Sequence, residues 1–296
     1  MSHANHRKRW LSLALGLCGA APLRAQDHRP APPVIVTLDG ILNAEHDDSP
    51  ALTPDGNTVF FDRTIDRAKS IMMSHRSGGR WTPPETAPFS GRWLDQDPAV
   101  SPDGSFLVFS SNRPVSENGD SVIFREGGKE YRGANLWKIE RHGNGWGPPV
   151  WLGPAVNGGT LVVAPSIAAN GALYFIQRLG GAMHIFRSEY RNGAYLPAVR
   201  VALGDSAQPT HDPAVAPDES FLVFDYGKGA NTLGRLSIAY REGDHWSAPH
   251  DLGDDVNRDS PWGAHLSPDH RTVYVTGSTH IWSYSLEPWL SEQTVR

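Results

Sequence analysis

The stretch that decides the fold of this chain reads Asp97-Pro98-Ala99-Val100-Ser101-Pro102-Asp103-Gly104-Ser105-Phe106-Leu107-Val108-Phe109-Ser110. Pro102 presets the backbone for a tight turn, and Asp103-Gly104 supply a hydrogen-bonding side chain and a residue that tolerates positive φ. The β-branched and aromatic residues that follow are typical of a strand. The stretch therefore predicts two short strands joined by a Pro-Asp-Gly turn.

The same pattern recurs along the chain, with turns marked by Pro54, Pro102, Ala169, Pro217 and Pro268. Their separations are 48, 67, 48 and 51 residues, close to the period of four-stranded propeller blades. Each complete unit continues with a third strand, an aromatic residue followed by a proline, and a fourth strand. The sequence predicts an all-β, five-bladed β-propeller over residues 33–287.

The fifth unit ends after its third strand, at Leu286-Glu287-Pro288, and residues 288–296 are predicted to form a C-terminal tail. Pro33 to Asn43 resembles the outer-strand segments that precede the other units. We therefore expect this N-terminal strand to complete the last blade and close the ring. Closure in this way removes the open edge that a linear array of blades would expose.

Residues 1–25 have the layout of a secretory signal peptide, in which basic residues at 7–9 precede the apolar run 10–18 and then small residues. Cys18 suggests lipid attachment as an alternative, but Leu17 stands where a small residue is normally needed, so cleavage after Ala25 is favoured. The apolar run is too short to span a bilayer. We expect a periplasmic or secreted protein that starts with a short leader, residues 26–32.

Without residues 1–25 the chain keeps 23 basic and 32 acidic residues, a net charge of −9. This charge argues against binding of nucleic acid or anionic lipid. Cys18 is the only cysteine, so the mature chain has no disulfide. The remaining chain is long enough to bury a core without one, and we expect a monomer with no membrane span.

The pattern Asp-Pro-Ala-Val-Ser-Pro-Asp-Gly, followed by Phe-Leu-Val-Phe, resembles the WD-like repeats of TolB-type propellers over residues 33–287. The ending at Trp246-Ser247, with Leu252 to Asn257 after it, is similar to periplasmic propeller modules that often accompany peptidoglycan-binding domains. The resemblance implies the propeller fold and a place in the cell envelope. TolB proteins have six blades, whereas five units are counted here, and the shared motif is structural and implies no catalytic residue.

Polar residues lie in the segments that lead into the first strand of several units. In a propeller these segments surround the mouth of the central channel. The residues are His46, Asp47, Asp48, Asp97, His211 and Asp212. Loops on the same face bring Arg63, Arg113 and Arg178. Arginine can hold a carboxylate or phosphate while aspartate accepts from hydroxyls or amines, so these residues suit a polar ligand or a cation. In the alternative interpretation, the aspartates accept hydrogen bonds from neighbouring backbone N–H groups and tie the blades together. No cofactor is expected, but a structural or ligand-bridging Ca²⁺ stays open.

Two further features allow more than one interpretation. The repeated aromatic residues could form a sugar platform, but their recurrence in each unit favours packing between blades: Trp81, Trp146, Tyr195 and Trp246. The second unit carries 19 additional residues between Asn112 and Ala134. Such a loop on the mouth face serves binding or gating, or is simply mobile.

The sequence contains no nucleophile elbow, no Gly-rich phosphate loop and no paired-His zinc motif. We interpret the chain as an exported, non-enzymatic binding or scaffold module for an envelope protein, peptide or glycan. The alternative is a carbohydrate-active enzyme. A five-bladed ring with Asp48, Asp97 and Asp212 at its mouth resembles the arabinan- and xylan-cleaving glycosidases, which need two carboxyl groups at a defined spacing.

Overall fold

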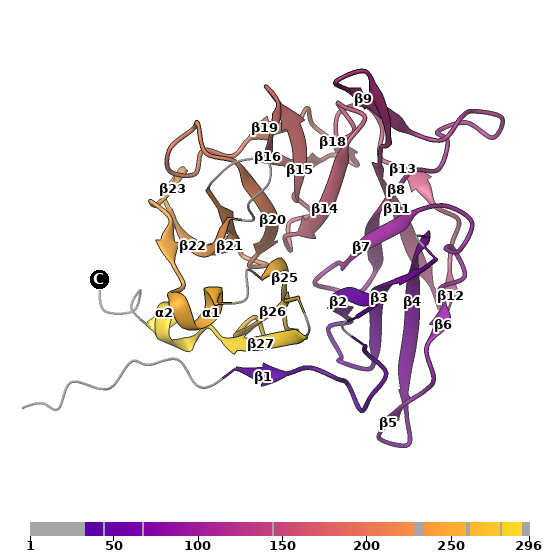
Figure 1. The fold of residues 1–296 in the computed structure, drawn as a ribbon, viewed down its shortest axis with the longest axis horizontal. Coiled ribbons are helices and arrows are strands. Elements are labelled where there is room, and N and C mark those ends of the chain that lie inside the picture. The colour runs from indigo at the N-terminus through magenta and orange to yellow at the C-terminus, as the bar shows by residue number, and fades with distance from the viewer. Residues whose placement is uncertain are drawn as a thin grey trace, which may run out of the picture.

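The computed structural model describes residues 33–43, 45–66, 68–143, 145–227, 234–258, 261–278 and 280–291. Five antiparallel sheets stand around a central axis, each with its first strand innermost (Figure 1). This arrangement confirms the predicted all-β, five-bladed propeller. The predicted signal peptide, the leader and residues 292–296 of the tail lie outside the described residues.

The first two blades follow the chain in order. Blade 1 consists of β2 (Asp47–Leu52), β3 (Thr58–Ile65), β4 (Ala68–Ser77), β5 (Arg80–Trp81) and β6 (Glu85–Thr86). Blade 2 consists of β7 (Asp95–Val100), β8 (Phe106–Ser111), β11 (Asn135–His142), β12 (Gly145–Trp146) and β13 (Val150–Trp151).

The next two blades repeat this plan. Blade 3 consists of β14 (Val162–Ile167), β15 (Leu173–Leu179), β16 (Ala182–Ser188) and β19 (Val199–Arg200), and it carries the small hairpin of β17 (Tyr190–Arg191) and β18 (Ala194–Tyr195). Blade 4 consists of β20 (Thr210–Val215), β21 (Phe221–Tyr226), β22 (Arg235–Glu242), β23 (His245–Trp246) and β24 (His250–Asp251).

The last blade closes the ring. It consists of β25 (Trp262–Leu266), β26 (Thr272–Thr276), β27 (Ile281–Ser285) and the N-terminal strand β1 (Val34–Ile35). β1 lies beside β27, with Val34 opposite Ser283, and the Val36 amide donates to the Ile281 carbonyl at 2.8 Å (Figure 1). The N-terminal strand therefore completes the fifth blade, as the truncated last unit predicts.

Each inner strand contains one β-bulge where it pairs with the second strand of its blade. The bulged residues have φ between 46° and 65°, and they are Ser49, Asp97, Ala164, Asp212 and Gly263. Four of the five precede a proline, which disfavours the right-handed helical conformation. Asp97 and Asp212 are thus structurally equivalent to each other, whereas Asp48 lies one position earlier in its blade. This corrects the sequence-based grouping of the three aspartates.

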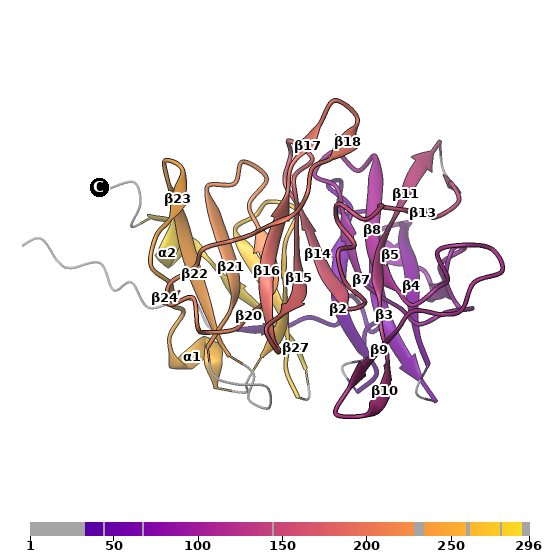
Figure 2. The same cartoon turned by 90° about the horizontal axis from the view of Figure 1, so that it is seen from above.

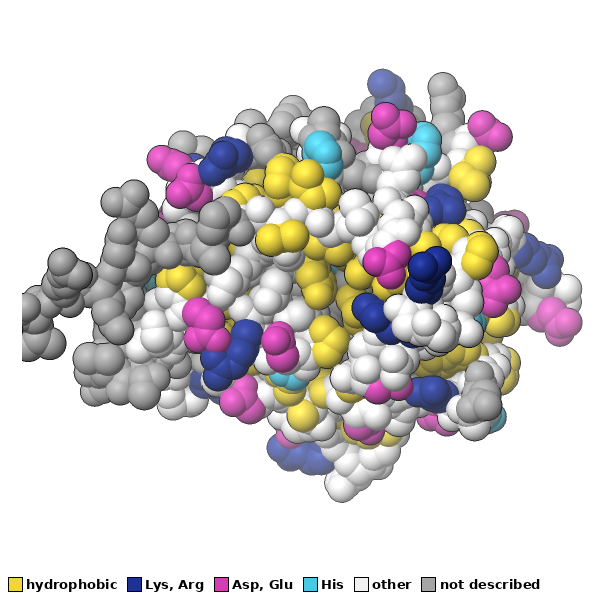
Figure 3. Space-filling view, turned by 90° about the horizontal axis from the view of Figure 1, so that it is seen from below, with side chains coloured by type: hydrophobic (Ala, Val, Ile, Leu, Met, Phe, Trp, Pro, Cys, Tyr) yellow, Lys and Arg dark blue, Asp and Glu magenta, His cyan; other side chains and the backbone are white. Residues whose placement is uncertain are grey.

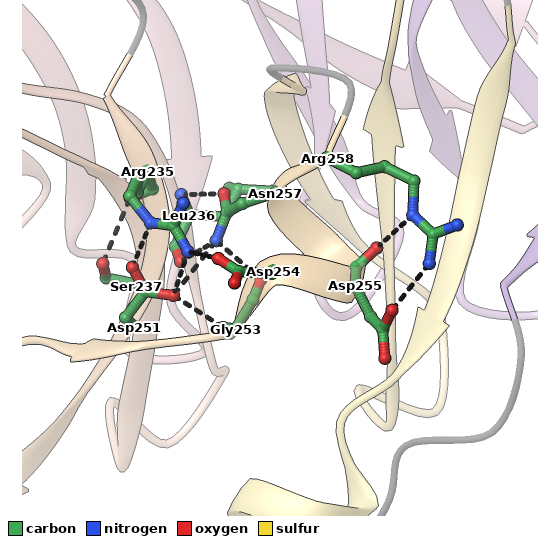
Figure 4. A network of polar contacts seen from close by, with 9 residues as sticks. All are labelled: Arg235, Leu236, Ser237, Asp251, Gly253, Asp254, Asp255, Asn257 and Arg258. Carbon is green, nitrogen blue, oxygen red and sulfur yellow. Dashed lines mark hydrogen bonds and ion pairs between the residues drawn. The ribbon is translucent and has the colours of Figure 1, made fainter.

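A side chain caps the third strand in four blades. The Leu136 amide donates to Asn157 Oδ1 at 2.7 Å, and the Leu236 amide donates to Asn257 Oδ1 at the same distance (Figure 4). Ser90 Oγ and Thr210 Oγ1 accept from the equivalent amides of the other two blades. The recurring Leu-Gly-x-x-Val-Asn motif is therefore structural, because its asparagine replaces a strand hydrogen bond.

The repeated aromatic residues pack between blades, as their recurrence predicts. Trp146 of blade 2 meets Phe60 of blade 1 edge-on, with ring centroids 5.4 Å apart. Trp246 of blade 4 meets Tyr174 of blade 3 in the same way, at 6.3 Å. Trp81 packs with Ile281 of the last blade in one buried cluster. These rings belong to the interior of the propeller and do not form a sugar platform.

Most of the additional residues of the second unit form a hairpin of β9 (Ile123–Glu126) and β10 (Lys129–Arg132). The hairpin and the short helix α1 (Asp254–Asn257) lie on one face of the ring, and β17–β18 and β23 lie on the opposite face (Figure 2). A second short helix, α2 (Glu287–Ser291), packs Trp289 and Leu290 against a buried cluster of the last two blades. No helix among the described residues is long and apolar enough to cross a membrane.

Candidate functional site

A cavity of about 80 Å³ lies at the centre of the ring, at the ends where the inner strands begin. All five blades contribute to its wall through their bulged residues. Charged and aromatic side chains complete the lining: Asp48, Lys69, Asp97, Asp212, Trp262 and His265. A second cavity of about 100 Å³, lined by the prolines of the turns, shares His265 with the first. The channel is thus polar at one end and Pro-rich at the other.

Lys69 is the one cation in this lining, and it is held by blade 1. Its Nζ lies 2.9 and 3.1 Å from the two carboxylate oxygens of Asp48, and 3.6 Å from Oδ2 of the fully buried Asp62. Burial would lower the pKa of Lys69, but the charges of Asp62 and Asp48 outweigh it and raise the pKa. Lys69 is therefore a charged ammonium enclosed by carboxylates.

Three carboxylates join neighbouring blades. The Asp97 amide donates to both oxygens of Asp62 at 3.0 Å, and the Ala164 amide donates to Asp97 Oδ2 at 3.2 Å. The Gly263 amide donates to Asp212 Oδ2 at 3.1 Å. In each case the bulge turns its own amide toward a carboxylate of the preceding blade. One carboxylate oxygen of Asp97 and one of Asp212 therefore bind a backbone amide of the next blade, as the alternative interpretation predicts. Both side chains nevertheless line the cavity.

Blade 4 holds two carboxyl groups that disfavour ionisation. Burial raises the pKa of Asp212 to about 6, with the charge of Asp97 as the next cause. Burial, and then the charge of Asp212, raise the pKa of Asp225 well above its ordinary value. Both Asp225 oxygens are buried, and the only group among the described residues that can bond to them is the carboxyl group of Asp212, through a proton that Asp225 retains. This carboxyl group is stable only if it keeps its proton or meets a cation.

Two histidines lie near these carboxyl groups. Burial lowers the pKa of His265 to about 4, so its imidazole is neutral at pH 7. His265 occupies a position where the other four blades have alanine or serine. Burial also lowers the pKa of His211, whose Nδ1 is buried without a partner among the described residues. Neither imidazole adds positive charge to the channel at neutral pH.

Two of the expected ligand-binding arginines form buried ion pairs. Arg63 Nε donates to the buried Asp47 at 2.7 Å, and Arg113 Nη2 donates to the buried Asp95 at 2.7 Å. Each guanidinium also donates to a backbone carbonyl, that of Ile41 or of Phe89. The structure therefore does not bring Arg63, Arg113 and Asp47 into the cavity, because they fasten the segments that lead into blades 1 and 2.

The remaining residues of the predicted site also lie outside the cavity lining. Arg178 pairs with Glu126 of the β9–β10 hairpin, and its guanidinium lies 6.0 Å from the ring centroid of Phe124. His46 is exposed, and its backbone carbonyl accepts from the Thr64 amide. Of the nine predicted residues, Asp48, Asp97 and Asp212 line the cavity.

The arrangement is an acidic cavity with a charged lysine on one side. Among the described residues, no group of three or more His, Cys, Asp or Glu side chains is placed to hold a metal ion. The calcium ion that the sequence left open has no such group there. On one edge of the ring, acidic and basic side chains are intermingled with hydrophobic ones (Figure 3). The cluster of carboxyl groups that lines the channel is therefore the candidate for a functional site.

No protein-family model matches the chain, and no curated protein matches it in sequence. Solved structures with a similar fold include a TolB-type protein from Agrobacterium tumefaciens, with 16% identity, a TM-score of 0.50, and coverage of 78% of this chain and 69% of that one. The α-L-arabinofuranosidase from Lactobacillus brevis has 11% identity, a TM-score of 0.52, and coverage of 84% and 92%.

A further similar structure is TolB from Acinetobacter baumannii, with 16% identity and a TM-score of 0.48. The match covers 81% of this chain and 54% of that protein, so the chain spans about half its length. At these identities the similarity concerns the β-propeller fold alone. TolB proteins and an enzyme appear together among these structures, so the fold does not decide between binding and catalysis.

Proposed function

We propose that this chain is an exported, monomeric β-propeller that binds one end of an envelope protein, peptide or glycan in its central cavity, without catalysing a reaction. The observation that carries the proposal is the polar cavity itself. All five blades line it, and it holds three aspartates and one lysine. A cavity with convergent polar groups on a rigid scaffold is the usual form of a ligand site.

Rigidity of the carboxyl groups supports binding. Asp97 accepts hydrogen bonds from Ala164 N, Ser110 Oγ and Gln96 Nε2, so its orientation is fixed before any ligand arrives. The Gly263 amide fixes Asp212 in a similar way. Binding then requires little ordering of side chains, which preserves affinity.

The test uses residues 26–296, immobilised and titrated with soluble peptidoglycan fragments, with an envelope extract as a second source of ligands. Asp212→Asn keeps an acceptor oxygen for the Gly263 amide but removes the carboxylate charge from the cavity. Asp244→Asn makes the same change of charge on a fully exposed side chain and is the matched control. Saturable binding that D212N weakens and D244N preserves is expected, whereas binding that both variants preserve would refute the cavity as the site.

One observation favours a carbohydrate-active enzyme as the second candidate. Asp212, with a pKa raised to about 6 by burial, suits a general acid, and Asp48, which pairs with Lys69 in the same cavity, is the candidate for a base. Such an enzyme would release reducing ends from arabinan or xylan and lose this activity in D212N but not in D244N. The binding proposal predicts no release by the wild-type chain.

A further inference from the structure

Blades 1 and 4 place a buried aspartate at the same position of their second strand. Asp62 lies opposite Asp48 in the pairing of β2 with β3, and Asp225 lies opposite His211 in the pairing of β20 with β21. Asp62 is 0% exposed and Asp225 is 1% exposed. Each has an acidic neighbour that lines the cavity, Asp48 in blade 1 and Asp212 in blade 4.

In blade 1 the two carboxylates share a cation. Lys69 Nζ contacts both oxygens of Asp48 and lies 3.6 Å from Asp62 Oδ2. Asp62 also accepts two hydrogen bonds from the Asp97 amide. Burial raises the pKa of Asp62, and the charge of Lys69 opposes this shift. Blade 1 thus supplies its buried acid with both a cation and hydrogen bonds from within the chain.

In blade 4 the corresponding cation is missing among the described residues. In blade 1, Asp62 pairs with Ile71, and Lys69 lies two residues before Ile71. In blade 4, Asp225 pairs with Leu236, and the residue two positions before Leu236 is Gly234. A Cβ atom at Gly234 would lie 2.8 Å from the Tyr226 backbone, so no side chain fits there without a shift. Both oxygens of Asp225 are buried, and among the described residues they have the carboxyl group of Asp212 beside them but no cation and no N–H donor. Within the part of blade 4 that the structure describes, the acidic site of blade 1 is thus repeated without its ammonium.

We infer that the blade 4 side of the cavity binds a primary ammonium group of the ligand, between Asp212 and Asp225. This inference rests on the proposed function and names the chemical class that the cavity selects. Like the Lys69 side chain, such a ligand ends in an ammonium group with three N–H donors and one positive charge on an alkyl stem. A lysine side chain, a peptide amino terminus and an amino sugar all carry it. Trp262, which lines the same cavity, offers an apolar surface for the stem.

The test is calorimetric titration of residues 26–296 with butylammonium chloride, with 1-butanol as the uncharged probe of the same shape. Wild-type chain is expected to bind butylammonium saturably and at least tenfold more tightly than 1-butanol. Asp225→Asn is isosteric and should weaken butylammonium binding at least tenfold, because it removes one of the two carboxyl groups. The matched control D244N removes a charge at an exposed site and should leave the affinity unchanged. Equal affinities for the two probes would overturn the inference, as would full affinity in D225N.

Two further variants keep the test decisive. Asp212→Asn, which retains an acceptor for the Gly263 amide, replaces D225N if the latter does not fold. Lys228 lies outside the described residues, so Lys228→Ala tests whether the chain supplies its own cation. Butylammonium binding in wild type and in K228A alike supports the inference. Binding that appears only in K228A overturns it, because a lysine of the chain would then fill the site.

Failure of this inference can be told apart from failure of the proposed function. If peptidoglycan fragments bind in a manner that D212N weakens, but butylammonium neither binds nor competes with them, the ammonium class is wrong and the cavity remains a binding site. If neither peptidoglycan fragments nor envelope components nor butylammonium bind, both proposals are wrong.

Discussion

Replacing Arg113 by methionine should destabilise the propeller by about 3–5 kcal/mol, the usual cost of removing one partner from a buried ion pair. The Asp95 side chain is fully buried and that of Arg113 is 10% exposed, and Nη2 to Oδ1 measures 2.7 Å. Methionine retains an apolar stem beside Phe109 and Trp137, on which the guanidinium now lies. After the change, Asp95 keeps its hydrogen bonds from Ser90 and Ser111 but loses its countercharge.

The assay is urea unfolding at neutral pH, followed by tryptophan fluorescence. With a slope of about 2–3 kcal/mol per molar urea, the expected loss moves the midpoint down by about 1–2.5 M. Arg271→Met is the matched control, since its ion pair with Glu287 is 61% and 50% exposed and its removal should leave the midpoint nearly unchanged. The double variant Asp95→Asn/Arg113→Met should be more stable than R113M, because no buried charge is then left alone.

This prediction separates a structural arginine from a ligand-binding one. A mouth arginine that waits for a ligand could be removed with little effect on stability. An R113M midpoint equal to that of R271M would therefore refute the structural role of the ion pair. A double variant less stable than R113M would refute the reasoning about the uncompensated carboxylate.

Three other variants test the fold and its titrating groups. Deletion of residues 33–43 removes β1 and the buried Leu42. It should lower the free energy of unfolding by several kcal/mol, because the blade edge is exposed and burial of one leucine alone contributes about 2 kcal/mol. A melting temperature within a few degrees of that of residues 26–296 would contradict closure by β1. Burial would raise the pKa of Glu219, but hydrogen bonds from Arg187, Tyr174 and Asn170 outweigh it and lower the pKa to about 2. The stability from this group is present above its ordinary pKa of 4.5 and is lost as the pH falls toward 2, so Glu219→Gln should narrow the difference between melting temperatures at pH 5 and pH 3, and an unchanged difference would contradict the assignment. Burial and the charge of Asp212 raise the pKa of Asp225. The stability that this group contributes is therefore present below its ordinary pKa and is lost as the pH rises. The melting temperature of D225N relative to wild type should increase from pH 4 to pH 8, and a constant difference would count against a buried carboxyl group at this position.

The blade count and the closing strand could be predicted from the sequence because both depend on local signals. Turns like those at Pro54 and Pro102 recur every 48 to 51 residues, apart from the second unit with its 19 additional residues, and the last unit lacks a strand that residues 33–43 resemble. The arginines of the candidate site were harder to place, since Arg113 could face the channel or a buried partner. Only the register that brings it to Asp95 decides between these positions.

The centre of the site needed structural information for a different reason. Whether an aspartate aligns with Asp97 depends on which residue forms the bulge, and in blade 1 that residue is Ser49, one position after Asp48. Lys69 lies at the start of a third strand, far in sequence from the entry segments, and reaches them only through strand pairing. His265 did leave a signal, because the equivalent positions of the other units carry small residues.

The most direct test of the central claim is a crystal structure of residues 26–296 grown with saturating butylammonium chloride. Electron density for the probe is expected in the central cavity, with its nitrogen within hydrogen-bonding distance of Asp212 or Asp225 and its butyl stem toward Trp262. A probe found only on exposed carboxylates outside the channel, or a lysine or arginine side chain of the protein itself in contact with Asp225, would contradict the inference.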